Sequence, residues 1–117
     1  MESLKKYLSY SYYTLPLIDN FQDQKLIVVT AAGVIMGTPI SKNDSDESIH
    51  GLYSVATNFA NDYREEYSLN PEQRLDGNDG FMPLKDVTLQ SGHNTFHFDF
   101  LNVFFDQIVA ITIGKTN

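Results

Sequence analysis

The order of apolar and polar residues first predicts a β-hairpin near the N-terminal third of the chain. Residues 25–30 and 34–41 are rich in β-branched and other apolar side chains, and Ala31-Ala32-Gly33 between them has the composition of a turn. Gly37 lies inside the second strand, where glycine typically marks a bend or a bulge. Pro39 donates no backbone hydrogen bond, so this end of the strand is predicted to be an edge or an exit.

The strongest periodic signal predicts one amphipathic helix at about 47–67. Apolar residues recur there every three or four positions, at Ile49, Leu52, Tyr53, Ala56, Phe59, Ala60, Tyr63 and Tyr67. Asp44 and Glu47 have the spacing of a capping box, so Asp44 is the predicted N-cap, and Asn70-Pro71 ends the segment. Aromatic stripes of this kind usually belong to a core, so we expect this one to pack against the strands.

The last third of the chain predicts three strands, at 81–91, 95–105 and 108–113. In the long middle strand, alternation puts four phenylalanines on one face, namely Phe96, Phe98, Phe100 and Phe104. The other face begins polar and then becomes apolar at Leu101, Val103 and Phe105. Unless a bulge resets the alternation, we expect this strand to be covered on both faces or paired with another subunit.

Residues 2–13 predict a short amphipathic helix that stops before Pro16. Its apolar positions are Leu4, Tyr7, Leu8 and Tyr12, although so many tyrosines leave an extended arm as the alternative. The whole chain, 1–117, is therefore predicted to be a single domain, mainly β with helices. It has an N-terminal helix or arm at 1–20 and a helical insertion at 43–80, between the second and third strands.

The net charge of −7 is concentrated in the insertion. Residues 43–80 hold nine acidic and two basic residues, whereas the remainder holds six of each. Nucleic-acid binding relies on a surplus of Lys and Arg, so nucleic acid is a doubtful partner. The absence of cysteine excludes disulfides and thiolate chemistry and fits a reducing compartment. No apolar run resembles a signal peptide or approaches the ~18 residues of a membrane helix, so we expect a cytoplasmic protein without a membrane partner.

The residue patterns favour no catalytic or metal chemistry. His93 and His97 would lie about 13 Å apart on a strand that rises roughly 3.3 Å per residue. Residues 76–80 fit a flexible glycine turn better than a calcium loop, because the ligand positions of such a loop are not filled. The chain contains no nucleophile elbow, phosphate-binding loop or H-E-x-x-H motif. We therefore expect no enzyme, no catalytic residue, no metal and no cofactor.

Short motifs in the β segments resemble the Sm/LSm family. Leu84-Lys85-Asp86-Val87 and Asp106-Gln107-Ile108 are similar to the second half of that domain, and Gly33 and Gly37 are similar to its first hairpin. The resemblance covers residues 25–41 and 81–114. It implies a five-stranded, strongly bent Sm-like (SH3-like) barrel that forms a homo-oligomeric ring, in which the fourth strand of one subunit pairs with the fifth of the next. The interface candidates that it implies are Leu101, Val103, Phe105, Val109 and Ile111.

The resemblance also implies RNA binding at two short segments. Met82-Pro83 and Phe104-Phe105 occupy the positions where the family usually carries Met-Asn and Arg-Gly. The leading hypothesis is a non-enzymatic assembly or binding module that forms a homo-oligomer with an unknown ligand. One alternative is an RNA-binding protein with atypical base contacts. Another is a monomeric adaptor that binds a basic protein partner through Glu65 and Glu66 of its acidic helix.

Overall fold

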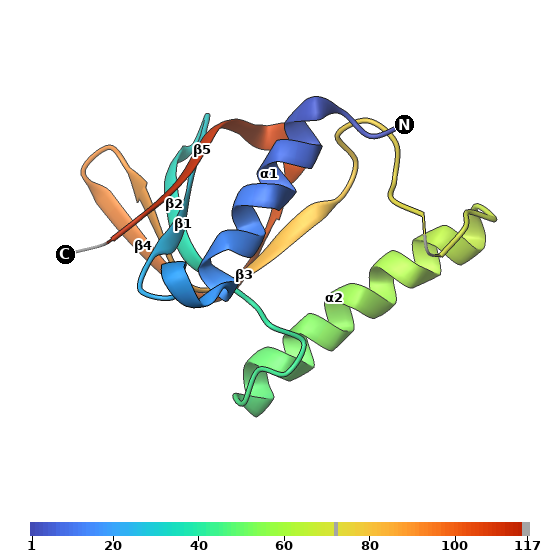
Figure 1. Cartoon of the computed structure of the whole chain (residues 1–117), viewed down its shortest axis with the longest axis horizontal. Helices are drawn as coiled ribbons and strands as arrows, with labels where there is room; N and C mark the ends of the chain where they lie inside the picture. The colour runs from blue at the N-terminus through green and yellow to red at the C-terminus, as the bar shows by residue number, and fades with distance from the viewer. Residues whose placement is uncertain (72, 116–117) are drawn as a thin grey trace.

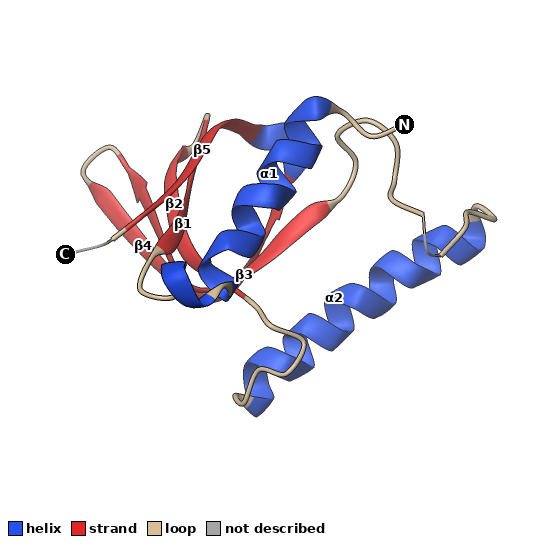
Figure 2. Ribbon diagram, viewed as in Figure 1, coloured by secondary structure: helices blue, strands red, loops and turns tan. Residues whose placement is uncertain are grey.

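The computed structural model describes residues 1–71 and 73–115 and combines one five-stranded antiparallel sheet with two helices (Figures 1 and 2). The elements are α1 (Leu4–Thr14), β1 (Lys25–Thr30), β2 (Gly33–Pro39), α2 (Glu47–Glu66), β3 (Phe81–Ser91), β4 (Asn94–Phe104) and β5 (Ile108–Gly114), with short 3-10 turns η1 (Leu15–Leu17), η2 (Asp19–Phe21) and η3 (Phe105–Gln107). The five predicted strands and both predicted helices are confirmed. An extended N-terminal arm is excluded, because α1 is helical.

The strand order across the sheet is β4-β3-β2-β1-β5. Each neighbouring pair is antiparallel, including β1 with β5, which is far from it in the sequence. Within the described residues, β4 and β5 stand at the two ends and each pairs with one strand. The sheet is therefore open, and the strongly bent Sm-like barrel that the resemblance implies is not confirmed.

Gly37 occupies the irregularity that its position in the strand predicts. The pairing of β2 with β3 shifts register between Met36 and Thr38, so β3 contains one extra residue there. A Cβ at Gly37 would lie 3.1 Å from Val87 Cγ2 and 3.2 Å from Leu84 Cβ. The two buried side chains converge on the bare glycine backbone, which explains why this position has no side chain.

The same irregularity resets the alternation of faces along the two long strands. Leu84 and Val87 are both buried although they are three residues apart, and Asp86 between them has a φ of 50°. Leu84 lies opposite Leu101, and Val87 lies opposite Phe98. Because residues opposite one another share a face, Phe98 joins the side of Leu101. The expectation that all four phenylalanines of this strand share one face is therefore wrong.

The core lies between the sheet and α1, and α1 contributes the opposite face from the predicted one. Its buried residues are Lys6, Ser9 and Tyr13. The predicted apolar positions Leu4, Tyr7, Leu8 and Tyr12 are all exposed. The buried core residues are Tyr13, Leu26, Val28, Ile35, Met82, Leu84, Val87, Val103, Phe105 and Ile108. Polar contacts of Lys6 and Tyr13 with other segments decide which side of α1 faces the sheet.

Helix α2 extends away from the sheet instead of covering it (Figure 1). Only Ile49 and Ala56 of this helix are buried, and Phe59 is 69% exposed. The expectation that its aromatic stripe packs in the core is therefore wrong. Its N-cap is Asp46, whose side chain accepts hydrogen bonds from the backbone N–H groups of Ser48 and Ile49, so the predicted cap at Asp44 is also wrong.

Candidate functional site

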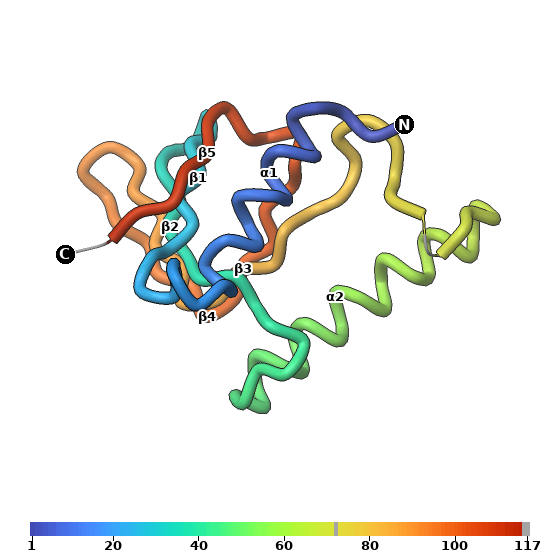
Figure 3. Tube along the Cα trace, in the orientation of Figure 1, coloured from blue at the N-terminus to red at the C-terminus, as the bar shows by residue number. Residues whose placement is uncertain are grey.

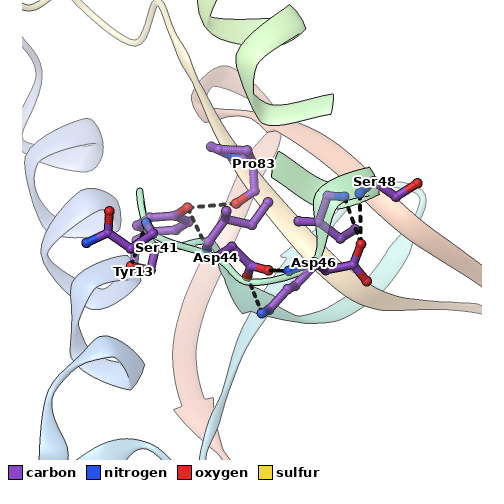
Figure 4. A network of polar contacts seen from close by, with 10 residues as sticks. Tyr13, Ser41, Asp44, Asp46, Ser48 and Pro83 are labelled. Carbon is purple, nitrogen blue, oxygen red and sulfur yellow. Dashed lines mark hydrogen bonds and ion pairs between the residues drawn. The ribbon is translucent and has the colours of Figure 1, made fainter. Parts of the chain in front are cut away.

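Tyr13 fixes α1 to the sheet through its hydroxyl group (Figure 4). The hydroxyl donates to the backbone oxygen of Pro83 at 2.7 Å and accepts from the backbone N–H of Ile40 at 3.1 Å. Burial of the ring raises the pKa of Tyr13 well above its usual range. One side chain thus joins α1, the end of β2 and the start of β3.

Two aspartates fix the start of α2 close to the same place (Figure 4). Asp44 pairs with Lys85 of β3 and accepts a hydrogen bond from the backbone N–H of Asp46. The hydrogen bond from Lys85, followed by the one from Asp46, holds the pKa of Asp44 below its usual range. Asp46 then caps the helix. The first candidate cap, Asp44, therefore acts as the link between the insertion and the sheet.

The loop after α2 returns to the start of α1 (Figure 3). The backbone N–H of Ser3 donates to the oxygen of Gly77 at 3.0 Å, and the N–H of Gly77 donates to the oxygen of Met1 at 3.0 Å. The Lys6 ammonium donates to the backbone oxygen of Leu75 at 2.6 Å. The insertion is consequently anchored at both ends.

A cavity of about 610 Å³ lies between α1, α2 and the start of β3. Both arginines of the chain, Arg64 and Arg74, line it together with Lys6 and Lys42, and Glu2 is the one carboxylate among the described residues of its wall. Aromatic side chains complete the wall, namely Tyr10, Tyr13, Tyr53, Phe81 and Phe105. The cavity is therefore cationic and aromatic, although the chain as a whole is acidic.

The charges in this cavity influence one another. Arg74 pairs with Glu2 at 2.8 Å, and its guanidinium carbon lies 4.6 Å from the centre of the Tyr10 ring. Burial lowers the pKa of Lys6, Glu2 and Asp79 oppose that shift, and Arg74 and Arg64 add to it. Lys6, Arg64 and Arg74 therefore lie close enough to influence one another electrostatically.

The open ends of the sheet form a second candidate site. On β4, Phe96, Phe98 and Phe104 are 48%, 39% and 57% exposed, and on β5 Val109 is 73% exposed. Exposed apolar side chains next to unpaired strand backbone favour the addition of another strand. Both ends of the sheet therefore have the character of a docking edge.

The five predicted interface residues divide into three groups. Val109 lies on the open β5 edge, and Leu101 and Ile111 are partly buried against the core. Val103 and Phe105 are buried inside the chain's own core. The side chains of those two residues stabilise the protomer and are not available to a neighbouring subunit.

The four predicted nucleic-acid positions lie close together where the start of β3 pairs with the end of β4, far from the hairpin turn between these strands. Met82 pairs with Val103 and Pro83 pairs with Asn102. Met82 and Phe105 are buried, and the backbone oxygen of Pro83 is taken by Tyr13. Phe104 is exposed and packs edge-on against Phe81 at 6.1 Å between ring centres. Of these four residues, Phe104 is the one that presents a ring to solvent.

The cationic cavity could not be inferred from the order of residues alone. Arg64 and Arg74 lie in the segment with the largest acidic excess, so a count of charges treats both as part of a solvated acidic surface. Lys6 lies on the side of α1 opposite the predicted apolar stripe, where a lysine is expected to be exposed. Its burial becomes visible only in the folded chain, so the order of residues contains no usable signal for this site. Only the folded return of residues 75–80 to α1 brings the cations together.

No three histidine, aspartate or glutamate side chains lie close enough, among the described residues, to hold a metal ion. Neither helix in the described part of the chain is long and apolar enough to cross a membrane. Comparison of the chain with protein-family models, with curated proteins and with solved structures gives no match.

Proposed function

We propose that the chain is a non-enzymatic assembly module with Sm-like architecture, in which β4 of one copy pairs with β5 of the next. The observation that carries the proposal is the pair of open edges, each with exposed apolar side chains. An apolar edge strand left bare is an aggregation hazard. Mutual pairing would cover both edges at once, because each copy offers one of each kind.

The strand order supports this proposal over a pairing of like edges. The Sm resemblance implies that the fourth and fifth strands meet between subunits, and these are the strands at the two ends of the sheet. Contact between unlike surfaces is heterologous, and it generates a closed ring or an open filament rather than a simple two-fold dimer. The expected product is thus an assembly of several protomers of 13.3 kDa.

Sedimentation velocity at micromolar concentration tests the proposal with two single variants. Phe98→Lys places a charge on the β4 edge, and Val109→Lys places one on the β5 edge. Each variant alone should sediment as a monomer. In a mixture, the intact β5 edge of the Phe98→Lys variant can pair with the intact β4 edge of the Val109→Lys variant. The mixture should therefore form a one-to-one dimer and nothing larger.

Val55→Lys serves as the control, because Val55 is also apolar and its exposure of 48% falls between those of Phe98 and Val109, but it lies on α2. It should assemble like the native chain. A native protein that is monomeric at micromolar concentration would overturn the proposal. Assembly that survives both edge substitutions would show that the edges are not the contact.

An adaptor function is a second candidate, favoured by the exposed aromatic stripe of α2. Phe59, Tyr63 and Tyr67 stand in solvent beside Glu65 and Glu66, a combination that suits a basic partner with apolar anchors. A lysine-rich peptide that contains leucines should bind the native chain and not the double variant Glu65→Lys/Glu66→Lys. The same change of charge at Asp19 and Asp23 is the control, and equal losses from both double variants would remove this candidate.

RNA binding remains a prediction that rests on Phe104, whose exposed ring could stack on a base. Fluorescence polarisation with uridine-rich and adenine-rich oligomers at low salt should show binding that weakens as salt rises. Phe104→Ala should reduce this binding, whereas Phe96→Ala, which removes an equally exposed ring of the same strand, should not. No binding at tens of micromolar protein would exclude this function.

A further inference from the structure

The cavity between α1, α2 and β3 has unsatisfied polar atoms of both kinds. The Nε atom of Arg64 is buried and donates to no acceptor in the described part of the chain. The Oε2 atom of Glu2 is buried and accepts from no donor there. Both residues line the same cavity. A buried polar atom without a partner is costly, so a molecule that offers both an acceptor and a donor would be held at this place.

Two of the other three cations of the cavity already have partners. Arg74 pairs with Glu2 and lies over the Tyr10 ring, and the Lys6 ammonium donates to the backbone oxygen of Leu75. Arg64 forms no ion pair with any described residue, although Glu65 and Glu66 follow it directly in the chain. Arg64 and the exposed Lys42 are therefore the cations with capacity left for a ligand oxyanion, and the planar fork of Arg64 suits a carboxylate or a phosphate.

The remaining walls favour a flat organic body. Tyr10, Tyr53 and Phe81 contribute aromatic surface around the cationic end. The volume of about 610 Å³ falls within the range of small-molecule sites, roughly 300–1,000 Å³. An inorganic anion would fill a small part of this space and would leave the aromatic surface uncovered.

We propose that this cavity binds a small organic anion, with its oxyanion on Arg64, an N–H or O–H group toward Glu2, and a flat ring among the tyrosines. Nucleoside monophosphates and aromatic amino acids share this chemistry. The site does not involve the β4 and β5 edges, so it is independent of assembly. A chain that binds no ligand could still assemble, and a chain that does not assemble could still bind the ligand, so the two proposals fail separately.

Isothermal titration calorimetry on the full chain tests the inference with named probes. AMP and CMP represent the phosphates, phenylalanine and tryptophan represent the amino acids, and inorganic phosphate and adenosine each lack half of the recognised chemistry. We expect one of the two organic classes to bind at least about tenfold more tightly than both half-probes. Equal binding of inorganic phosphate and AMP would overturn the proposed role of the flat body.

Arg64→Gln should weaken binding of the preferred probe by about tenfold to a hundredfold, the usual effect of losing a charged hydrogen bond in a buried site. Lys115→Gln removes one positive charge from an exposed residue outside the cavity wall and should leave binding within about twofold. Thr57→Phe fills the cavity from α2 without removing any charge and should also abolish binding. Equal effects of Arg64→Gln and Lys115→Gln, or undiminished binding to Thr57→Phe, would refute the site, as would no binding of any probe at millimolar concentration.

Discussion

Substitution of Tyr13 by phenylalanine should destabilise the protein through two lost hydrogen bonds while it keeps the aromatic packing. The Ile40 N–H is buried just beyond β2 and would have no acceptor, which costs about 1–3 kcal/mol. The lost bond to the oxygen of Pro83 adds roughly 0.5–1.5 kcal/mol. The expected decrease in the free energy of unfolding is about 2–4 kcal/mol, or roughly 10 °C in Tm for a chain of this size.

Urea unfolding followed by circular dichroism measures this change at a fixed protomer concentration, because assembly would make stability depend on concentration. Tyr12→Phe is the control. Tyr12 is the preceding residue of the same helix, but it is exposed, so its substitution should change stability by less than about 0.5 kcal/mol. If the two variants were equally stable, Tyr13 would not join α1 to the sheet as described.

The dependence of the free energy of unfolding on pH in the alkaline range gives a second test of the Tyr13 hydroxyl. Burial raises the pKa of Tyr13 in the folded chain, so the unfolded chain releases this proton first. Stability should therefore fall as the pH rises above about 10, by about 1.4 kcal/mol per pH unit from this group. The Tyr13→Phe variant should lose that contribution to the slope, whereas Tyr12→Phe should keep it.

The remaining predictions concern the sheet bend and the ends of the insertion. Gly37→Ala should destabilise the protein by about 1–3 kcal/mol, because the new Cβ would lie 3.1 Å from a core methyl group. Gly51→Ala, in open space on α2, should instead stabilise it by up to ~1 kcal/mol. Urea unfolding of the two variants measures both changes. Asp44→Asn should lose the pairing with Lys85. The pKa of Asp44 is lowered in the folded chain, so the stabilisation that this carboxylate provides is complete above about pH 5. That stabilisation is lost as the pH falls through 3.8 toward the folded pKa. The free energies of unfolding of the native chain and of the variant should therefore converge in acid. Asp46→Ala should cost about 1 kcal/mol and reduce the helix signal in far-UV circular dichroism, unlike Asp44→Asn.

The strands could be predicted closely because their signals are local. β1 occupies the predicted residues 25–30, and the hairpin turn at Gly33 and the irregularity at Gly37 were readable from residue type. The alternation of β4 could not be read in the same way. Its reset follows from pairing with β3, where Asp86 has a positive φ, and nothing within β4 itself records that event.

Both helices were predicted as helices. The side that α1 buries was not predicted, whereas the predicted stripe of α2 is buried only at Ile49 and Ala56. Periodicity identifies an apolar stripe and assumes that the stripe faces the core. In α1 the buried positions are instead Lys6, Ser9 and Tyr13, because a lysine and a tyrosine reach polar partners on other segments. Polar contacts between distant parts of the chain outweigh the local pattern here, and periodicity contains no information about them.

The insertion is held mainly at its two ends, and its helix α2 contributes no residue to the main core cluster. Asp44 ties its start to β3, and residues 75–77 tie its end to α1, so α2 is positioned without burying its aromatic stripe. A helix held mainly at its ends leaves space beside it, and the two arginines of the acidic segment line that space. The insertion therefore adds a ligand cavity on one side of the protomer, while β4 and β5 stay open for assembly. Substitutions at Arg64 and at Val109 should consequently have independent effects on ligand binding and on assembly.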